Sequence, residues 1–158
     1  NYFKNDVEIK LFKNIFKEII FASRMKVGFI YKINAETDNS LVSSIPNFDK
    51  FFLGGASSLR GWSSPIDYND EEGGLGRGLL NCEIRIPVYK IIGLELFYDA
   101  GFLNSDFFND ILKINNDFNW DIGWGIVVQS TLLPVRLDFA FKNGIGKPTM
   151  QVSLLNMF

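Results

Sequence analysis

The feature that most constrains the fold of this chain is an alternation of apolar and polar residues with a period of two, which recurs along most of its length. In the segment that begins at Leu80, apolar side chains occupy the even positions, whereas Asn81, Glu83 and Arg85 occupy the odd positions between them. Successive side chains of a β-strand point to opposite faces, so this pattern predicts strands with one apolar and one polar face. We therefore expect an all-β fold.

Seven segments carry this alternation. They span residues 5–13, 18–33, 76–90, 92–103, 118–131, 133–142 and 149–158. Several are longer than the usual strand of about five or six residues. Short connections are expected at 90–94 and 131–134, and longer polar loops at 34–49, 63–74 and 104–117. Short turns at one end and long loops at the other are typical of outer-membrane barrels.

The two faces of the predicted strands differ in chemistry. The apolar face is bulky and includes several aromatic residues, namely Trp120, Trp124, Phe139, Phe141 and Phe158, and Cys82 lies on this face as a small hydrophobic residue. The opposite face carries charges of both signs: Arg24, Lys26, Glu83, Arg85, Glu95, Asp99, Asp121, Arg136, Asp138 and Lys142. Alternation alone also fits a soluble barrel with an apolar interior. The aromatic face favours lipid outside and a water-filled lumen inside, hence an antiparallel transmembrane β-barrel.

The composition argues against several classes of function. The chain has no histidine and one cysteine, which removes the usual catalytic triads, the His-ligated zinc sites and any internal disulfide. The formal net charge of −2 gives no support for a nucleic-acid partner. We therefore predict a protein that is not an enzyme and has no metal site and no cofactor.

The number of strands raises a difficulty. Bacterial single-chain barrels have an even number of strands, at least about eight, and an open edge is not tolerated in lipid. Either a further strand lies near the N-terminus, or residues 1–158 are the C-terminal portion of a larger barrel. We favour the second interpretation.

Five segments, in order, resemble one family. They are Phe52–Trp62 (FLGGASSLRGW), Asn81–Pro87 (NCEIRIP), Leu96–Gly101 (LFYDAG), Gly123–Gly125 (GWG) and Leu133–Asp138 (LPVRLD). This set resembles the signature strands and loop of the BamA/TamA superfamily, the bacterial surface antigen family, and covers the chain from about Phe51 onward. The resemblance implies a sixteen-stranded barrel preceded by POTRA domains, of which these residues form about the last seven strands.

The resemblance also gives a role to the glycine-rich loop. Taken alone, the glycines would only shape a turn and leave Arg60 solvated. The family's loop, here about 46–75, folds back into the lumen, and its motif corresponds to Gly54, Gly55, Ser58, Arg60, Gly61 and Trp62. Arg60 is then expected to pair with Glu83 and Asp99, which the alternation independently assigns to the lumen face.

The function implied by the resemblance is the folding and insertion of client proteins into the outer membrane, or the translocation of a passenger. The last strand would form one side of a seam for the client, through Met150, Val152, Leu154 and Phe158. Implied partners are outer-membrane lipid, a client β-barrel or secreted protein, and accessory lipoproteins. The alternative is a ligand-binding or pore-forming barrel in which Ser57, Arg60 and Trp62 line the passage.

Three groups of charged residues have simpler interpretations than catalysis or metal binding. Arg136 and Asp138 share one strand face and are expected to form an ion pair in a wet lumen. Glu83 and Asp99 lack a sugar-binding motif, so a two-carboxylate hydrolase is not favoured. The acidic residues Asp67, Asp70, Glu71 and Glu72 lack calcium-ligand spacing and are expected in a solvated external loop.

Overall fold

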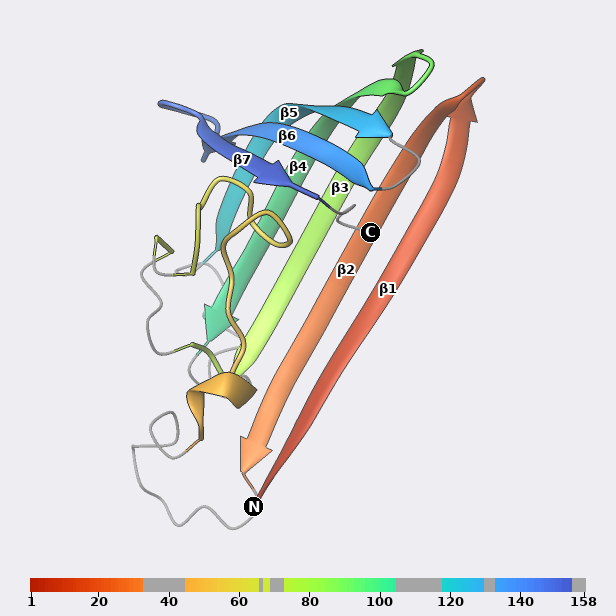
Figure 1. Ribbon diagram of the computed structural model, residues 1–158. Coiled ribbons are helices and arrows are strands. Elements are labelled where there is room, and N and C mark those ends of the chain that lie inside the picture. Colours follow the sequence, from red (N-terminus) through yellow and green to blue (C-terminus); the bar gives the residue numbers. More distant parts are fainter. Residues whose placement is uncertain (33–44, 66, 69–72, 105–117, 130–132, 155–158) are drawn as a thin grey trace.

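The fold is one antiparallel sheet of seven strands in sequence order, β1 to β7 (Figure 1). The computed structural model describes residues 1–158 except 33–44, 66, 69–72, 105–117, 130–132 and 155–158. The strands are β1 Tyr2–Phe16, β2 Ile19–Lys32, β3 Gly76–Tyr89, β4 Ile92–Asn104, β5 Asn119–Gln129, β6 Pro134–Lys142 and β7 Thr149–Ser153. A single 3-10 turn, η1, spans Asn47–Asp49 in the long connection between β2 and β3. The predicted all-β, antiparallel fold is confirmed.

The predicted strands agree with the structure to within one or two residues at each end, except the first and the last. The first strand is predicted too short at 5–13, because β1 pairs with β2 from Tyr2 opposite Lys32 to Phe16 opposite Ile19. Backbone pairing therefore continues beyond the part of β1 in which apolar residues alternate clearly. The last strand ends at Ser153, Leu154 lies in a bend, and Phe158 lies outside the described residues.

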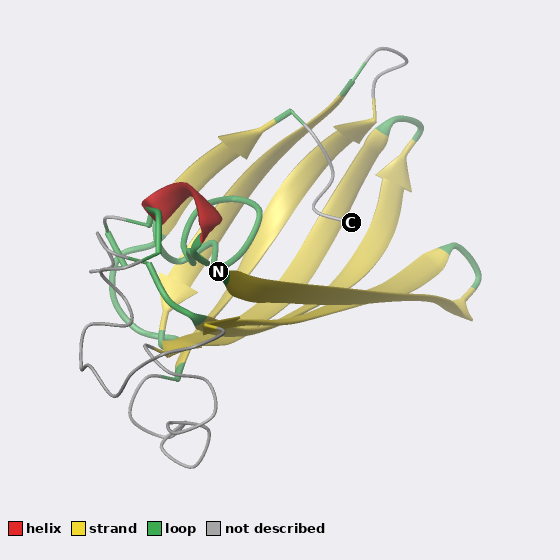
Figure 2. Cartoon of the chain, turned by 90° about the horizontal axis from the view of Figure 1, so that it is seen from below, coloured by secondary structure: helices red, strands yellow, loops and turns green. Residues whose placement is uncertain are grey.

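The sheet curls into a trough, and the connection between β2 and β3 lies on its concave side (Figure 2). Two-residue turns join β1 to β2 and β3 to β4, and each contains a lysine with positive φ, Lys17 at 50° and Lys90 at 44°. The long connection from β2 to β3 leaves from the opposite end of the sheet. The predicted separation of short turns from long loops is therefore present where the structure describes it.

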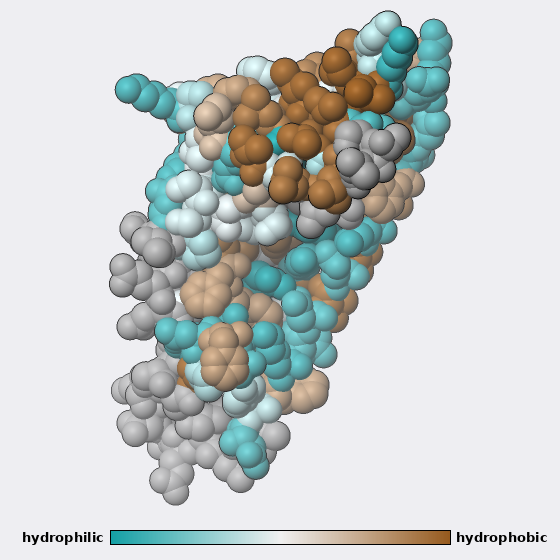
Figure 3. Space-filling model, in the orientation of Figure 1, coloured by the Kyte–Doolittle hydropathy of each residue, from teal (hydrophilic) through white to brown (hydrophobic). Residues whose placement is uncertain are grey.

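The convex face of the sheet is apolar and exposed. Cross-strand aromatic pairs cover it, such as Trp124 with Phe139, whose ring centroids are 4.5 Å apart. Hydrophobic surface also gathers over β6 and β7, near the C-terminal end of the described chain (Figure 3). No helix among the described residues is long and apolar enough to cross a membrane.

The core lies between the β2–β3 connection and the concave face. It consists of two small apolar clusters, Ile30, Ile45, Phe51 and Leu75 in the first, and Leu53, Leu59, Trp62 and Leu79 in the second. A β-bridge between Phe51 and Gly74 ties the two ends of the connection together. A polar loop is predicted at 34–49. In the part of it that the structure describes, 45–49, the apolar residue Ile45 is buried in the first of these clusters.

Candidate functional site

The glycine-rich segment forms a compact loop packed against the concave face. Gly54 has φ of +101°, and a Cβ there would lie 2.5 Å from the carbonyl oxygen of Ser64, so only glycine fits. The N–H of Gly55 donates to the carbonyl oxygen of Trp62 over 2.7 Å and closes the loop. A Cβ on Gly61 would lie 2.8 Å from the Cβ of Asp121, so glycine also permits the close approach of the loop to β5.

Arg60 is fully buried and is the centre of the contacts between this loop and the strands. Its Nε and Nη2 donate to the two carboxylate oxygens of Asp99 over 2.7 and 2.8 Å, which is a bidentate fork. Its Nη1 donates to Glu83 over 2.8 Å and to Glu95 over 3.2 Å. The guanidinium carbon lies 3.5 Å from the ring centroid of Phe97, in cation–π geometry. Arg60 therefore joins the loop to β3 and β4 at once.

The electrostatic environment keeps Arg60 charged. Burial lowers the pKa of the guanidinium, but the attraction and hydrogen bonds of Asp99, together with Glu83, outweigh burial and raise its pKa above its ordinary value. A base whose pKa is raised on folding contributes stability that is present below its unfolded pKa. Since that value is already far above neutral pH, the charge of Arg60 itself does not change in any ordinary assay.

The buried ionic cluster around Arg60 contains more acids than bases. Its arginines are Arg24, Arg60 and Arg136, and its carboxylates are Glu83, Glu95, Asp99, Asp121 and Asp138. The predicted pair of Arg136 and Asp138 is present at 2.8 Å, but both residues are 1% exposed, so their expected place in a wet lumen is wrong. Arg60 covers this pair from the loop side, with its Nη1 3.8 Å from Asp138.

The backbone of the loop is held by side chains from four strands. Each of these side chains donates to a loop carbonyl: Arg136 to that of Ala56 (3.0 Å), Arg24 to that of Ser57 (2.6 Å), Asn81 to that of Ser58 (2.7 Å), Thr149 to that of Gly61 (2.6 Å), and Gln151 to those of Arg60 (2.7 Å) and Trp62 (2.8 Å). Buried carbonyls need hydrogen-bond partners, and this loop has no strand neighbour to supply them. The concave face therefore fixes the path of the loop as well as the side chain of Arg60.

The structure brings together most of the residues that the sequence assigned to the loop motif. Arg60 contacts both Glu83 and Asp99, and the backbone N–H of Gly61 donates to Asp121 over 2.8 Å. Ser58 is buried, and its carbonyl accepts a hydrogen bond from Asn81. Its hydroxyl has no hydrogen-bond partner in the described chain.

Trp62 packs edge-on against Tyr68, with ring centroids 5.5 Å apart. Arg60 and Trp62 are buried, at 0% and 7% exposed, so among the described residues they do not line an open passage with Ser57.

Several residues of the site were not singled out from the sequence as partners of the loop. They are Asn81, Glu95, Phe97, Asp121, Thr149 and Gln151. The alternation assigns the members of β3, β4 and β5 to the concave face, and this signal could have found them as candidates. The alternation also places Thr149 and Gln151 on the face opposite to Met150 and Val152, but it does not show that they contact the loop, because this depends on where the loop passes beside β7.

The predicted external acidic loop is described only in part. Asp67 is exposed and accepts a hydrogen bond from Lys142 over 2.9 Å, whereas 69–72 lie outside the described residues. Hydrogen bonds from Lys142 and from the N–H of Ser63 hold the pKa of Asp67 below its ordinary value. The described chain has no group of three or more His, Cys, Asp or Glu arranged to hold a metal ion.

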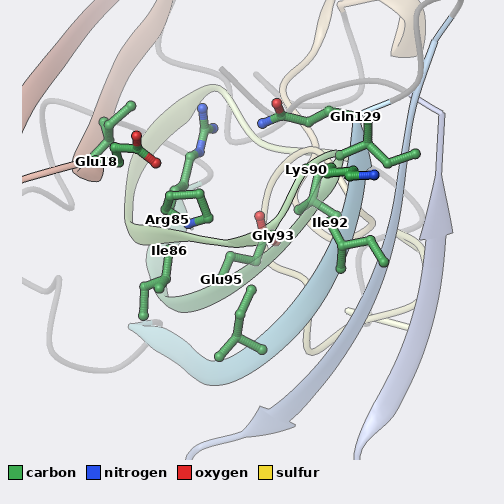
Figure 4. A pocket seen from close by; sticks show the side chains of 13 residues that line it. Glu18, Arg85, Ile86, Lys90, Ile92, Gly93, Glu95 and Gln129 are labelled. Atoms are coloured by element: carbon green, nitrogen blue, oxygen red, sulfur yellow. The ribbon is translucent and has the colours of Figure 1, made fainter.

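A hollow of about 280 Å³ lies at the end of the sheet where the turns are short (Figure 4). Charged residues Glu18, Arg85 and Lys90 line it together with aliphatic residues such as Ile92. Glu95, which accepts from Arg60, also lines the hollow, so the hollow adjoins the ionic cluster that holds Arg60. Charged residues therefore continue from the loop to the short turns, with aliphatic residues between them.

A curved antiparallel sheet with an apolar convex face, a charged concave face and a loop packed inside is the wall of a β-barrel of the outer-membrane type. The whole of 1–154 matches the model of the Omp85 superfamily domain. The chain belongs to the Omp85 superfamily, whose barrels are proteins of outer membranes or organellar envelopes, and the resemblance to the BamA/TamA barrels is confirmed.

Two known proteins show the extent of the similarity. Outer envelope protein 39, chloroplastic, from Arabidopsis thaliana is 25% identical over an alignment of 154 residues, and the alignment covers 91% of this chain and 40% of that protein. The crystal structure of BamA from Haemophilus ducreyi lacking POTRA domains 1-3 matches with a TM-score of 0.69 and 14% identity, over 95% of this chain and 33% of that one. The chain thus spans less than half the length of either protein.

Proposed function

We propose that this chain is the C-terminal portion of an outer-membrane β-barrel that folds and inserts client proteins into the membrane. On this proposal residues 1–158 supply the last strands of a barrel of about sixteen strands, and the loop of about 46–75 is its inward-folded loop. Membership of the Omp85 superfamily and the BamA-like fold support the proposal.

The observation that carries the proposal is the position and length of β7. This strand has five residues, pairs with β6 on one side, and is the last strand of the described sheet. Its outward side chains Met150 and Val152 are 64% and 65% exposed, and Leu154 just beyond it is 59% exposed. An edge strand offers backbone groups to an incoming strand, and a short edge strand can exchange its partner at lower cost than a long one.

The proposed mechanism needs no chemical step and no cofactor. A client strand would add to β7 by β-augmentation, with its apolar side chains continuing the convex, lipid-facing surface. The loop held by Arg60 would brace the concave face while the strands at the seam exchange partners. Outer-membrane lipid and the client are the essential partners, and accessory lipoproteins would belong to the complete assembly machinery.

The test is an insertion assay in lipid vesicles. The intact protein is refolded into vesicles, an unfolded client β-barrel is added, and its folding is followed by heat-modifiable gel mobility. Faster client folding than in empty vesicles is expected. Unchanged client folding, together with transport of an unfolded passenger into the vesicle, would instead favour a translocating barrel of the same superfamily.

The location of the client strand can be tested by disulfide crosslinking. In a background with the native Cys82 replaced by alanine, Val152→Cys on β7 should crosslink to a cysteine in the client's terminal strand. Ile122→Cys on β5 is the control, because it is also exposed on the convex face but lies in the middle of the sheet. Equal crosslinking at both positions would contradict a specific role for β7.

A further inference from the structure

The last strand is attached to the rest of the molecule through the loop as well as through β6. Gln151 is 9% exposed, and its side-chain amide donates to the carbonyls of Arg60 and Trp62 over 2.7 and 2.8 Å. Thr149 donates its hydroxyl to the carbonyl of Gly61 over 2.6 Å. These three hydrogen bonds reach three consecutive residues of the loop from two alternate positions of one strand.

The same loop residues are anchored on their other side to the interior of the sheet. The side chain of Arg60 binds Asp99 and Glu83, while its carbonyl accepts from Gln151. The N–H of Gly61 donates to Asp121, while its carbonyl accepts from Thr149. The segment from Arg60 to Trp62 therefore connects β7 directly to β3, β4 and β5, strands that β7 does not pair with.

The β-ladder of β7 is short in comparison with this connection. Among the residues that the structure describes, five residue pairs join β7 to β6, whereas thirteen join β3 to β4. Short ladders open at lower free energy than long ones, so the three side-chain hydrogen bonds are a large part of what fixes β7. The loop is thus expected to contribute substantially to the position of the edge strand.

We propose that Thr149 and Gln151 are positioning residues that couple the edge strand β7 to the loop anchored by Arg60, so that the two are released together. Release of the loop then loosens β7, and separation of β7 from β6 loosens the loop. Only the use of this coupling, to free β7 for a client strand, rests on the proposed function. The coupling itself stands on the hydrogen bonds of the described residues.

The experiment is amide hydrogen exchange of the intact protein in lipid vesicles, read in peptides that cover the loop at 56–62 and the β7 segment at 149–153. Gln151→Met keeps the side-chain length but removes both donors. Exchange is expected to rise by about thirtyfold in both peptides, because two hydrogen bonds of roughly 1 kcal/mol each are lost and about 1.4 kcal/mol corresponds to a factor of ten. Thr149→Val should raise exchange in both peptides to a smaller extent.

Three further variants distinguish coupling from general loosening. Thr149→Ser keeps the hydroxyl donor and should restore the protection that Thr149→Val removes. Ser153→Ala is the matched control on the same strand and face, since the Ser153 hydroxyl has no hydrogen-bond partner in the described structure. Arg60→Lys should raise exchange in β7, although the side-chain ion partners of Arg60 lie on β3, β4 and β6.

Coupling requires changes at both ends. Increased exchange in β7 alone after Gln151→Met, or in the loop alone after Arg60→Lys, would overturn the inference. Heat-modifiable mobility of each variant verifies that the barrel has folded, and Thr149→Val supplies the result if Gln151→Met does not fold. Coupled exchange in a protein that fails to accelerate client folding would count against the proposed function and leave the coupling intact.

Discussion

Replacement of Arg60 by lysine tests whether the buried fork, rather than positive charge alone, holds the loop in place. Lysine keeps the charge but presents a compact ammonium that cannot bind both oxygens of Asp99 as the guanidinium does at 2.7 and 2.8 Å. The ammonium also loses the planar contact with Phe97, where the guanidinium carbon lies 3.5 Å from the ring centroid.

The magnitude follows from the number of contacts and their burial. Arg60 is 0% exposed and makes charge-assisted hydrogen bonds to three carboxylates, of which lysine can keep only part. Loss of about two such bonds, at roughly 1.5–3 kcal/mol each, lowers the free energy of unfolding by about 3–6 kcal/mol. The loss is expected to release the loop before the strands unfold, since the side chain of Arg60 binds the loop to β3 and β4, whereas the pairing between the strands does not involve Arg60.

The molecule contains a matched control. Arg77 also contacts both oxygens of one carboxylate, since its Nη2 donates to the two oxygens of Asp6 at 2.7 and 2.8 Å, and it also lies over a phenylalanine ring, that of Phe51. Its partner Asp6 is 44% exposed, so Arg77→Lys should cost about 1 kcal/mol or less.

The assay for both substitutions is urea unfolding in lipid vesicles, followed by tryptophan fluorescence and by heat-modifiable mobility. If the Arg60 and Arg77 variants lost the same stability, burial of the fork would not be what makes Arg60 important.

Three further substitutions follow from the same geometry. Asp121→Asn should change the free energy of unfolding by less than about 1 kcal/mol, because an amide oxygen still accepts from the loop and one charge leaves a cluster with excess acid; a large loss in urea unfolding would contradict this. Gly61→Ala should destabilise by about 1–3 kcal/mol through its clash with β5, whereas Gly93→Ala, with its nearest neighbour at 3.5 Å, should be close to neutral in the same assay. Lys142→Met should raise the pKa of Asp67 and lower the free energy of unfolding relative to the parent protein. This difference should be present above the ordinary Asp pKa and should disappear as the pH falls below it. A difference in the free energy of unfolding that persists in urea titrations at strongly acidic pH would refute the assignment.

The division of the chain into strands and faces could be predicted from the sequence because it depends on local alternation. Glu83 and Asp99 each alternate with the apolar residues of their own strand, which predicts that both lie on the polar face, and the glycines around Arg60 mark a loop that can approach them closely. The alternation also assigns Glu95 and Asp121 to this face. What it does not give is the register, which places Asp99 opposite both Asn81 and Asp121.

The contacts of β7 could not be predicted for a different reason. Thr149 and Gln151 bind loop carbonyls, and a carbonyl carries no sequence signal. The contacts depend on the curvature of the whole sheet, which brings β7 toward the loop over the concave face (Figure 2). The length of β1 was also underestimated, because backbone pairing with β2 does not require the clear apolar alternation by which strands are recognised.

The chemistry of the loop explains why an interior contact of this kind is charged rather than apolar. An apolar loop could pack against a sheet in several neighbouring positions, since hydrophobic contact is not directional. The fork of Arg60 is directional and needs Glu83 of β3 and Asp99 of β4 on the same face at fixed distances. A shift of either strand by one residue would turn these carboxylates toward the convex face and leave a buried arginine unpaired. The loop can therefore dock only on a sheet whose strands are in register, and through Gln151 this condition extends to the edge strand at which we propose that clients are received.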